Sequence, residues 1–257
     1  MELKEKLKRR RKVFGCWTST GDESVVEMFL YAKFDFLGVD LEHSTIDLNK
    51  TKNIISLCEK YKVPCLPRVP GIDSSLIRRV LDAGASGIIV PTVETESDVN
   101  KLIEIMKYPP LGRRGYGISK ASTFGNKFNE YTRNWNKNSI LVIQIENLRG
   151  ANNLKKILSK KKEIDAVMIG PYDLSGSLGM PGKFNNKTFI NLTKKIIKEC
   201  HANKMSVGIH EVNPSKQNIN KLTKLGYNFM VLSSDIFLLL DWTRNISKIL
   251  NLFKKRK

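Results

Sequence analysis

The sequence has few cysteines and no long apolar run. Its four cysteines, at positions 16, 58, 65 and 200, form no C-x-x-C pair. We therefore expect reduced structural thiols, and neither a disulfide framework nor a zinc site. No apolar stretch is long enough to cross a bilayer, and the charged first residues contain no apolar signal core. These absences exclude a membrane partner and predict a cytoplasmic protein.

Acidic residues are scarce relative to basic ones, with 25 Asp and Glu against 44 Lys and Arg and a formal net charge of +19. Such an excess makes nucleic acid a candidate partner. The lysines, however, are scattered over expected helix surfaces and loops, with local runs only at the two ends and at 160–162. We expect no specific nucleic-acid binding, although weak binding at low salt is compatible with this charge.

No G-x-G-x-x-G motif follows the first apolar segment, which weakens the alternative of a doubly wound open sheet. The chain instead alternates apolar, strand-like segments with amphipathic ones. The expected strands are 13–18, 34–41, 63–69, 87–93, 140–146, 166–170, 206–210 and 229–233. The expected helices are 22–32, 48–61, 74–83, 94–106, 151–159, 187–202, 214–225 and 236–253. Eight such repeats in 257 residues predict a single α/β domain over 1–257, a (β/α)8 TIM barrel with an extra N-terminal helix.

One long region, about 107–139, has no clear periodicity. It begins with Tyr-Pro-Pro-Leu-Gly-Arg-Arg-Gly and continues with Ser, Thr and Asn. Long segments without regular structure are usually functional loops. We expect an active-site cover or a subunit contact.

The stretch 141–147, Leu-Val-Ile-Gln-Ile-Glu-Asn, reads as a buried strand that carries two polar side chains on one face, Gln144 and Glu146. A carboxylate there must be paired or bind a cation. Asp173 follows the next expected strand, so the two carboxylates should be neighbours at the carboxyl end of the barrel, where two carboxylates and water commonly hold Mg²⁺ or Mn²⁺. The alternatives are a buried salt bridge or a structural polar network for Glu146, and an N-cap role for Asp173.

Two further polar residues end expected strands. Arg68 closes an otherwise apolar segment, and its guanidinium could hold a carboxylate or stabilise an oxyanion; the alternative is an ion pair with Asp40 or Glu42. His43 is one of three histidines and follows the second strand, a position suited to a general base.

Lysine is absent from the interiors and carboxyl ends of all eight expected strands. A Schiff-base aldolase needs such a lysine, so enolate stabilisation by a metal is the better prediction. No Gly-rich loop follows the last two strands, so a phosphate site is not indicated there.

Several stretches together resemble the class II, metal-dependent pyruvate aldolases of the HpcH/HpaI family. They run in order from about residue 14 to residue 234. The most specific are Val39-Asp-Leu-Glu-His43, Val142-Ile-Gln-Ile-Glu146 and Gly170-Pro-Tyr-Asp-Leu-Ser175. Shorter matches are Pro67-Arg-Val69, Leu81-Asp-Ala-Gly84, Tyr108-Pro-Pro-Leu-Gly112 and Arg114-Gly115.

The resemblance implies a role for each matching residue. Glu146 and Asp173 would hold a divalent metal (Mg²⁺, Mn²⁺ or Co²⁺), and Gln144 would hydrogen-bond the substrate. The backbone N–H groups of Tyr172 and Asp173 would receive the pyruvate carboxylate. Arg68 would stabilise the transition state, and His43 would be the base, made more basic by Asp82. The resemblance also implies a homo-oligomer, a hexamer or trimer.

Asp82 does not fit the expected geometry, because it ends the third helix and should face the opposite rim. Either the chain bends there or Asp82 acts across a subunit contact. His210 stands where the family is usually apolar and shapes the aldehyde pocket, so we expect it to bind substrate and the aldehyde to be more polar than a simple aliphatic one. Leu41 in place of Gly and Tyr172 in place of Ala or Ser are the other departures.

The function that the resemblance implies is reversible cleavage of a 4-hydroxy-2-oxo acid to pyruvate and an aldehyde, so the partners would be a small-molecule 2-oxo acid and aldehyde. An alternative on the same fold is a CoA-thioester lyase like citrate lyase β or malyl-CoA lyase. A non-enzyme alternative is a basic nucleic-acid-binding protein on a degenerate barrel. The sequence does not name the aldehyde, the preferred metal or the pathway.

Overall fold

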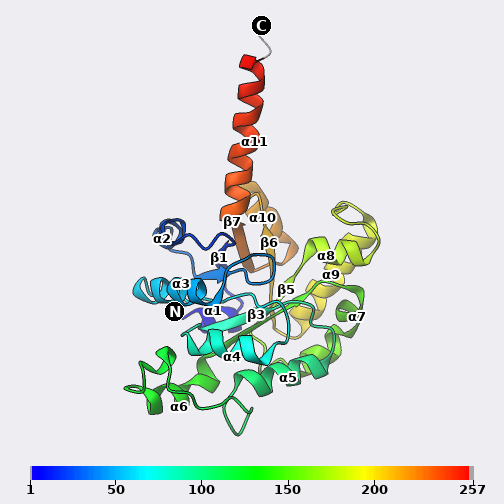
Figure 1. Ribbon diagram of the computed structural model, residues 1–257. Coiled ribbons are helices and arrows are strands. Elements are labelled where there is room, and N and C mark those ends of the chain that lie inside the picture. The colour runs from blue at the N-terminus through cyan, green and yellow to red at the C-terminus, as the bar shows by residue number, and fades with distance from the viewer. Residues whose placement is uncertain (1, 255–257) are drawn as a thin grey trace.

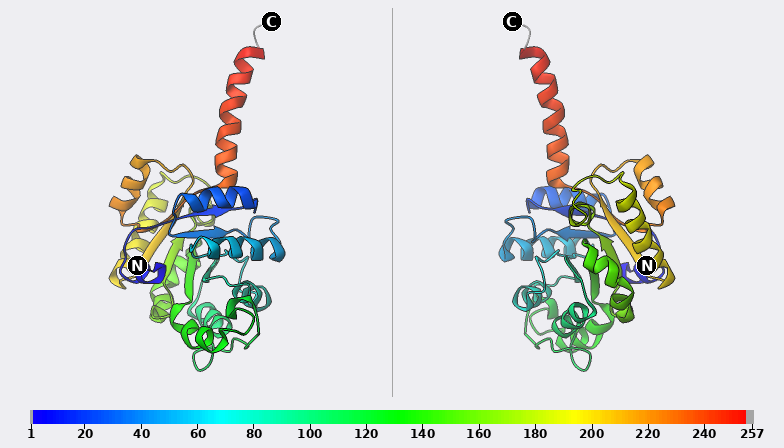
Figure 2. Two further views of the ribbon diagram at one scale, coloured as in Figure 1. Left: turned by 90° about the vertical axis from the view of Figure 1, so that its left-hand side faces the viewer. Right: turned by 90° about the vertical axis from the view of Figure 1, so that its right-hand side faces the viewer.

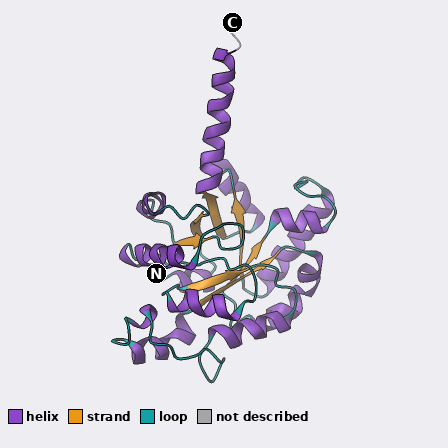
Figure 3. Ribbon diagram, viewed as in Figure 1, coloured by secondary structure: helices purple, strands orange, loops and turns teal. Residues whose placement is uncertain are grey.

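The computed structural model describes residues 2–254 and shows an α/β fold in which helices surround a parallel sheet (Figures 1 and 3). The sheet has seven strands in the order β2-β1-β7-β6-β5-β4-β3. The strands are β1 (Val13–Thr18), β2 (Phe36–Val39), β3 (Gly87–Val90), β4 (Ile140–Ile145), β5 (Ala166–Ile169), β6 (Ser206–Glu211) and β7 (Phe229–Ser234).

The prediction of eight regular strands is wrong in one place, because 63–69 forms only isolated bridges. Cys65 bridges Leu37 of β2, and Arg68 bridges both Asp40 and Ile89. This segment thus lies between the two edges of the sheet, β2 and β3. Its two prolines, at 64 and 67, have no N–H to donate, which interrupts a regular ladder. The architecture is consistent with a TIM-like barrel, but not with a regular (β/α)8 barrel.

The expected helices all form, with small differences at their ends. They are α1 (Leu3–Lys8), α2 (Glu23–Tyr31), α3 (Leu48–Lys60), α4 (Ser74–Asp82), α5 (Glu96–Met106), α7 (Leu148–Ile157), α9 (Lys187–Ala202), α10 (Lys216–Leu225) and α11 (Asp235–Lys254). A short helix, α8 (Pro171–Ser177), follows β5 directly. Side-chain caps fix several starts: Asp22 accepts from the Val25 N–H, and Asp73 accepts from the N–H groups of Ser75 and Leu76.

The first helix, α1, closes the amino end of the barrel. Its buried residues, Leu3 and Leu7, join the apolar cluster inside the barrel with Phe36, Phe229 and Ile140. Lys4 anchors the helix, because its Nζ donates to the Ser139 carbonyl at 2.6 Å and pairs with Asp165 at 2.8 Å. The helix α1 therefore fills the amino end of the barrel interior with apolar side chains, and we expect the active site at the carboxyl end of the strands.

The region 107–139 is more regular than expected and lies at the amino end of its own barrel. It contains a 3-10 turn, η1 (Lys120–Ser122), and a helix, α6 (Phe128–Asn138). Its aromatic residues Phe128, Tyr131 and Trp135 recur at helical spacing, and Trp135 is buried with Tyr131 partly buried beside it, so the helix carries a short apolar stripe among polar residues. A cover over this subunit's own carboxyl-end site is excluded by this position, and a subunit contact stays a prediction.

The last helix, α11, extends away from the rest of the molecule in every view (Figures 1 and 2). Asp235 is its one buried residue within the part of the helix that the structure describes. No helix among residues 2–254 is long and apolar enough to span a membrane.

Candidate active site

Six of the predicted site residues line one cavity of about 940 Å³ at the carboxyl end of the strands. They are His43, Arg68, Gln144, Tyr172, Asp173 and His210. They come from five different strand ends, which parallel strands bring to the same rim. A cavity of this size and mixed lining is typical of small-molecule sites.

Arg68 is held on three sides. Its Nε and Nη2 donate to the two carboxylate oxygens of Asp40 at 2.9 and 2.8 Å. Its guanidinium carbon lies 4.2 Å from the centroid of the Trp17 ring, and Glu42 Oε2 is 3.3 Å from its Nε. The predicted alternative of an ion pair with Asp40 or Glu42 is confirmed. This bidentate clamp fixes the guanidinium at the rim.

His43 is largely exposed at the mouth of the cavity, and its Nε2 lies 3.7 Å from Glu42 Oε2. The N–H groups of Glu42 and His43 both donate to Asp40 Oδ1, so Asp40 orders this turn as well as Arg68. Burial raises the pKa of the Glu42 carboxyl to about 6, although Arg68 opposes the shift. The rim therefore brings together an imidazole, a guanidinium and a carboxyl group of raised pKa.

Glu146 is buried, with 6% of its surface exposed. Its Oε1 accepts from the N–H and hydroxyl of Thr92, both at 2.7 Å, and its Oε2 accepts from Gln144 Nε2. Among residues 2–254 it makes no ion pair within 4.0 Å, so of its two predicted alternatives the buried salt bridge does not hold, whereas the structural polar network, with Thr92 and Gln144, is present. A buried carboxylate without a cation is costly unless donors or a bound ion offset its charge.

Asp173 lies in the first turn of α8, and Gly170 holds the N-cap position. The alternative that Asp173 caps this helix is therefore wrong. Ile145 and Ile169 pair across β4 and β5, so Glu146 and α8 start at the same end of neighbouring strands. The first-turn N–H groups of Tyr172 and Asp173 have no partner among the described residues, which leaves two donors at the cavity.

The donor set fits a hard divalent cation. No group of three or more His, Cys, Asp and Glu that could hold a metal occurs in the described chain, so the protein would supply two carboxylates, with water or substrate oxygens as the other ligands. Gln144 Oε1 is buried without a partner. Gly170 leaves open the space beside Glu146, because a Cβ there would lie 2.7 Å from Oε2.

Asp82 is not near His43 in its own chain. It ends α4 at the opposite rim, where its Oδ1 accepts from Arg114 Nη2 at 2.6 Å. Arg114 is itself enclosed by the rings of Tyr108, Tyr131 and Trp135. The chain does not bend to bring Asp82 to the cavity, so the first of the two expected alternatives is wrong.

Comparison with known proteins agrees with this arrangement. The sequence pattern of HpcH/HpaI aldolase/citrate lyase matches residues 13–241. The chain belongs to the HpcH/HpaI aldolase/citrate lyase family. The predicted resemblance is thereby confirmed.

Two relatives illustrate the range within the HpcH/HpaI family. The chain is 33% identical over 248 residues, 95% of each chain, to hydroxypyruvate/pyruvate aldolase of Roseobacter denitrificans. It is 29% identical over 236 residues, 91% of each chain, to 2-dehydro-3,6-dideoxy-6-sulfogluconate aldolase of Pseudomonas putida. Among solved structures, the HpcH/HpaI aldolase of Desulfitobacterium hafniense matches with a TM-score of 0.87 at 25% identity, covering 97% and 96% of the two chains.

Two residues that hold side chains of the candidate site in place, Thr92 and Trp17, were not predicted from the sequence. Thr92 adopts a left-handed φ of 52° and turns both of its donors toward Glu146. Trp17 carries Arg68 on its ring face. Thr92 has no sequence signal, because a left-handed threonine is not predictable from its type. Asp40 was visible in the Asp-Leu-Glu-His stretch, but only as a possible partner for Arg68.

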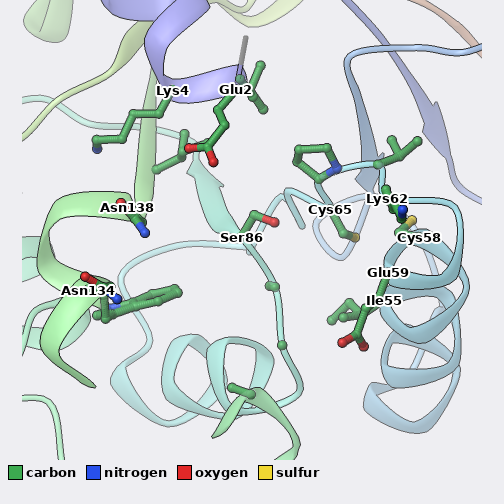
Figure 4. Close-up of a pocket in the computed structure, with 18 of the residues that line it drawn as sticks. Glu2, Lys4, Ile55, Cys58, Glu59, Lys62, Cys65, Ser86, Asn134 and Asn138 are labelled. Carbon is green, nitrogen blue, oxygen red and sulfur yellow. The ribbon is translucent and has the colours of Figure 1, made fainter. Parts of the chain in front are cut away.

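A second cavity, of about 870 Å³, lies at the opposite end of the barrel. Figure 4 shows Glu2, which precedes α1, and Lys4 of α1 above it, Asn134 and Asn138 of α6 on one side, and Glu59 of α3 on the other. Lys4 and Lys6 are paired with Asp165 and Asp35. None of the predicted site residues lines this cavity, so it is not the candidate active site.

Proposed function

We propose that the protein is a divalent-metal-dependent aldolase that reversibly cleaves a 4-hydroxy-2-oxo acid to pyruvate and an aldehyde. The observation that carries this proposal is the gathering of His43, Arg68, Gln144 and Asp173 around one cavity, with Glu146 directly behind it. The names of the relatives, which are aldolases acting on pyruvate or on deoxy sugar acids, support the same reaction class.

Glu146 and Asp173 would hold the ion, Mg²⁺, Mn²⁺ or Co²⁺. When bound, it would act as a Lewis acid toward the carboxylate and keto oxygens of the oxo acid. The free N–H groups of Tyr172 and Asp173 would receive the substrate carboxylate, and Gln144 would hydrogen-bond the substrate. The segment 63–69 would take the place of the eighth strand of the barrel, since it lies between β2 and β3 and places Arg68 at the carboxyl-end rim.

His43 would accept the proton of the C4 hydroxyl as the C3–C4 bond breaks. The electrons of the O–H bond form the aldehyde carbonyl, and those of the C3–C4 bond form the enolate of pyruvate. Arg68 would offset the enolate charge, and a donor of this kind contributes about 3 to 4 kcal/mol of barrier lowering in other enzymes. Protonation at C3 then gives pyruvate.

Asp82 would act across a subunit contact, because it lies at the wrong rim for its own His43. A homo-oligomer, hexamer or trimer, is supported by α11, which exposes Trp242, Leu252 and Phe253 by 65, 69 and 71%. Apolar side chains in such number on a protruding helix indicate a protein interface. Analytical ultracentrifugation of Trp242→Ser against the parent chain tests this, with a smaller particle expected for the variant.

The proposed activity is tested by pyruvate release from a panel of 4-hydroxy-2-oxo acids. We expect release that EDTA abolishes and that added Mg²⁺, Mn²⁺ or Co²⁺ restores. Acetyl-CoA release from malyl-CoA in the same assay would instead favour the thioester-lyase alternative. Activity that survives EDTA unchanged would exclude the metal-dependent mechanism.

A further inference from the structure

The His210 ring presents a buried nitrogen without a partner to the candidate active site. His210 lies on β6 and lines the same cavity as Arg68 and Asp173. The ring is fixed between Trp17 and Phe237, with centroid distances of 4.8 and 5.6 Å. Its Nε2 is buried and makes no hydrogen bond. A side chain held this firmly cannot turn away to find another partner.

Whether Nε2 donates or accepts a hydrogen bond depends on which ring nitrogen carries the proton. The backbone of Ser233 favours the protonated ring, and because Nε2 has no partner among residues 2–254, we place the proton of the neutral ring on Nδ1, toward Ser233. Burial nevertheless lowers the pKa of His210 to about 4, so the imidazole is neutral at pH 7. In a neutral imidazole with the proton on Nδ1, Nε2 carries a lone pair and is an acceptor only.

The protein does not supply the missing donor. Arg68 is the cation beside the ring, but its Nε and Nη2 are taken by Asp40, with Glu42 close to Nε as well. A buried acceptor left without a donor is costly in free energy. Since the position lines a cavity, a ligand is the natural source of that donor.

We propose that His210 Nε2 accepts a hydrogen bond from a hydroxyl group of the aldehyde substrate, so that the enzyme selects hydroxyaldehydes. The inference rests on the proposed aldolase function and adds the substrate class. An alkyl aldehyde has no donor for Nε2 and leaves it unsatisfied. A carboxylate-bearing aldehyde brings only lone pairs to the lone pair of Nε2.

The experiment measures aldol addition of pyruvate to matched aldehydes with the metal-loaded enzyme. Glycolaldehyde and propanal differ only by a hydroxyl in place of a methyl group, as do 3-hydroxypropanal and butanal, and glyoxylate supplies a carboxylate. We expect kcat/KM for the better hydroxyaldehyde to exceed that for its alkyl partner and for glyoxylate by about 10- to 100-fold.

His210→Leu should reduce that preference at least tenfold, mainly by lowering kcat/KM for the hydroxyaldehyde. His201→Leu is the matched control, because His201 lies on α9 and bonds the Gly226 carbonyl outside the cavity; it should keep the preference. If His210→Leu folds poorly, His210→Gln, which retains an acceptor oxygen, should keep part of the preference.

Exchange of the pyruvate methyl protons with D₂O, measured without aldehyde, separates this inference from the proposed function. Exchange that is absent in the parent enzyme would count against the aldolase itself. Intact exchange together with equal rates for the matched aldehydes, a preference for glyoxylate, or an unchanged ranking in His210→Leu would overturn the role of His210 alone.

Discussion

Two arginine–aspartate pairs lie at opposite ends of the barrel and look alike. Arg68 is clamped by Asp40 at the carboxyl end, and Arg114 is bound by Asp82 at the amino end. Both guanidinium groups stack on aromatic rings, Arg68 on Trp17 at 4.2 Å and Arg114 on three rings at 4.5 to 5.5 Å. Both arginines are more than nine-tenths buried. The pair and its stacking alone therefore do not mark a catalytic site.

The difference lies in what surrounds each pair. Around Arg68 the cavity is lined by His43 and Asp173, and Gln144 and His210 each have a buried polar atom without a partner among residues 2–254. Around Arg114 three aromatic rings enclose the guanidinium, and the one buried polar atom there without a partner among residues 2–254 is its own Nε. Polar groups that are left unsatisfied beside a cavity are available to a substrate, while a filled aromatic cage provides stability.

The largest effect is expected for Arg68→Lys. Lysine cannot reproduce the bidentate contact with Asp40 or offer a planar guanidinium to the enolate. We predict a loss of about 100- to 1000-fold in kcat/KM for pyruvate release, with a far-ultraviolet circular dichroism spectrum like that of the parent. Activity within a factor of three of the parent would remove Arg68 from the mechanism.

Arg114→Met should act mainly on folding. The change removes the cation from three aromatic rings and leaves the partly exposed Asp82 unpaired, which costs about 2 to 3 kcal/mol in free energy of unfolding. Urea denaturation of the metal-free protein measures this, and Arg68→Met under the same conditions is the comparison. If the free energy of unfolding falls less in Arg114→Met than in Arg68→Met, Arg114–Asp82 is not the structural pair and Arg68–Asp40 is not the functional one.

Asp82→Asn tests whether the amino-end pair also serves a neighbour. We predict a fall of about tenfold in kcat if Asp82 raises the basicity of a neighbour's His43. Mixing unfolded His43→Ala and Asp82→Asn chains and refolding them together should regain activity, because some sites then combine an intact His43 with an intact Asp82. If the mixture is no more active than its parts, the contact across subunits is wrong.

Glu42→Gln should give the smallest effect, visible as a pH dependence. The folded-state pKa of Glu42, about 6, lies above its ordinary value of 4.5, so this group stabilises the fold below pH 4.5 and loses that contribution as the pH rises through 6. Relative to the parent, the variant in EDTA should gain about 1 kcal/mol between pH 4.5 and pH 7. A constant difference across that range would show that Glu42 does not titrate as described.

Much of this architecture could be predicted from the sequence, because apolar segments and amphipathic helices alternate clearly. The failures have identifiable causes. The segment that contains Pro64 and Pro67 has an apolar, strand-like pattern. The two prolines have no N–H to donate, so they interrupt the hydrogen-bond ladder of the sheet. The helix Phe128–Asn138 carries a stripe of only three aromatic residues among polar ones, and of these Trp135 alone is buried, so its helical period is weak in the sequence.

The candidate site was predictable where polar residues end apolar strands, as with Glu146 and Asp173. The contacts that support the site could not be predicted, since Thr92, which bonds Glu146, and Trp17, which stacks on Arg68, lie far from their partners in the sequence and carry no chemical signal of their own. Two alternatives were predicted for Asp82; the position of α4 rules out a bend within one chain, and action across a subunit contact stays a prediction.

The most direct test of the metal-dependent mechanism is pyruvate release by the double variant Glu146→Ala, Asp173→Ala, assayed with saturating Mn²⁺ and beside the parent enzyme in EDTA. We predict that both lose essentially all activity, while the double variant keeps a folded circular dichroism spectrum. Cleavage at the parent rate by the folded double variant would contradict the assignment of these two carboxylates.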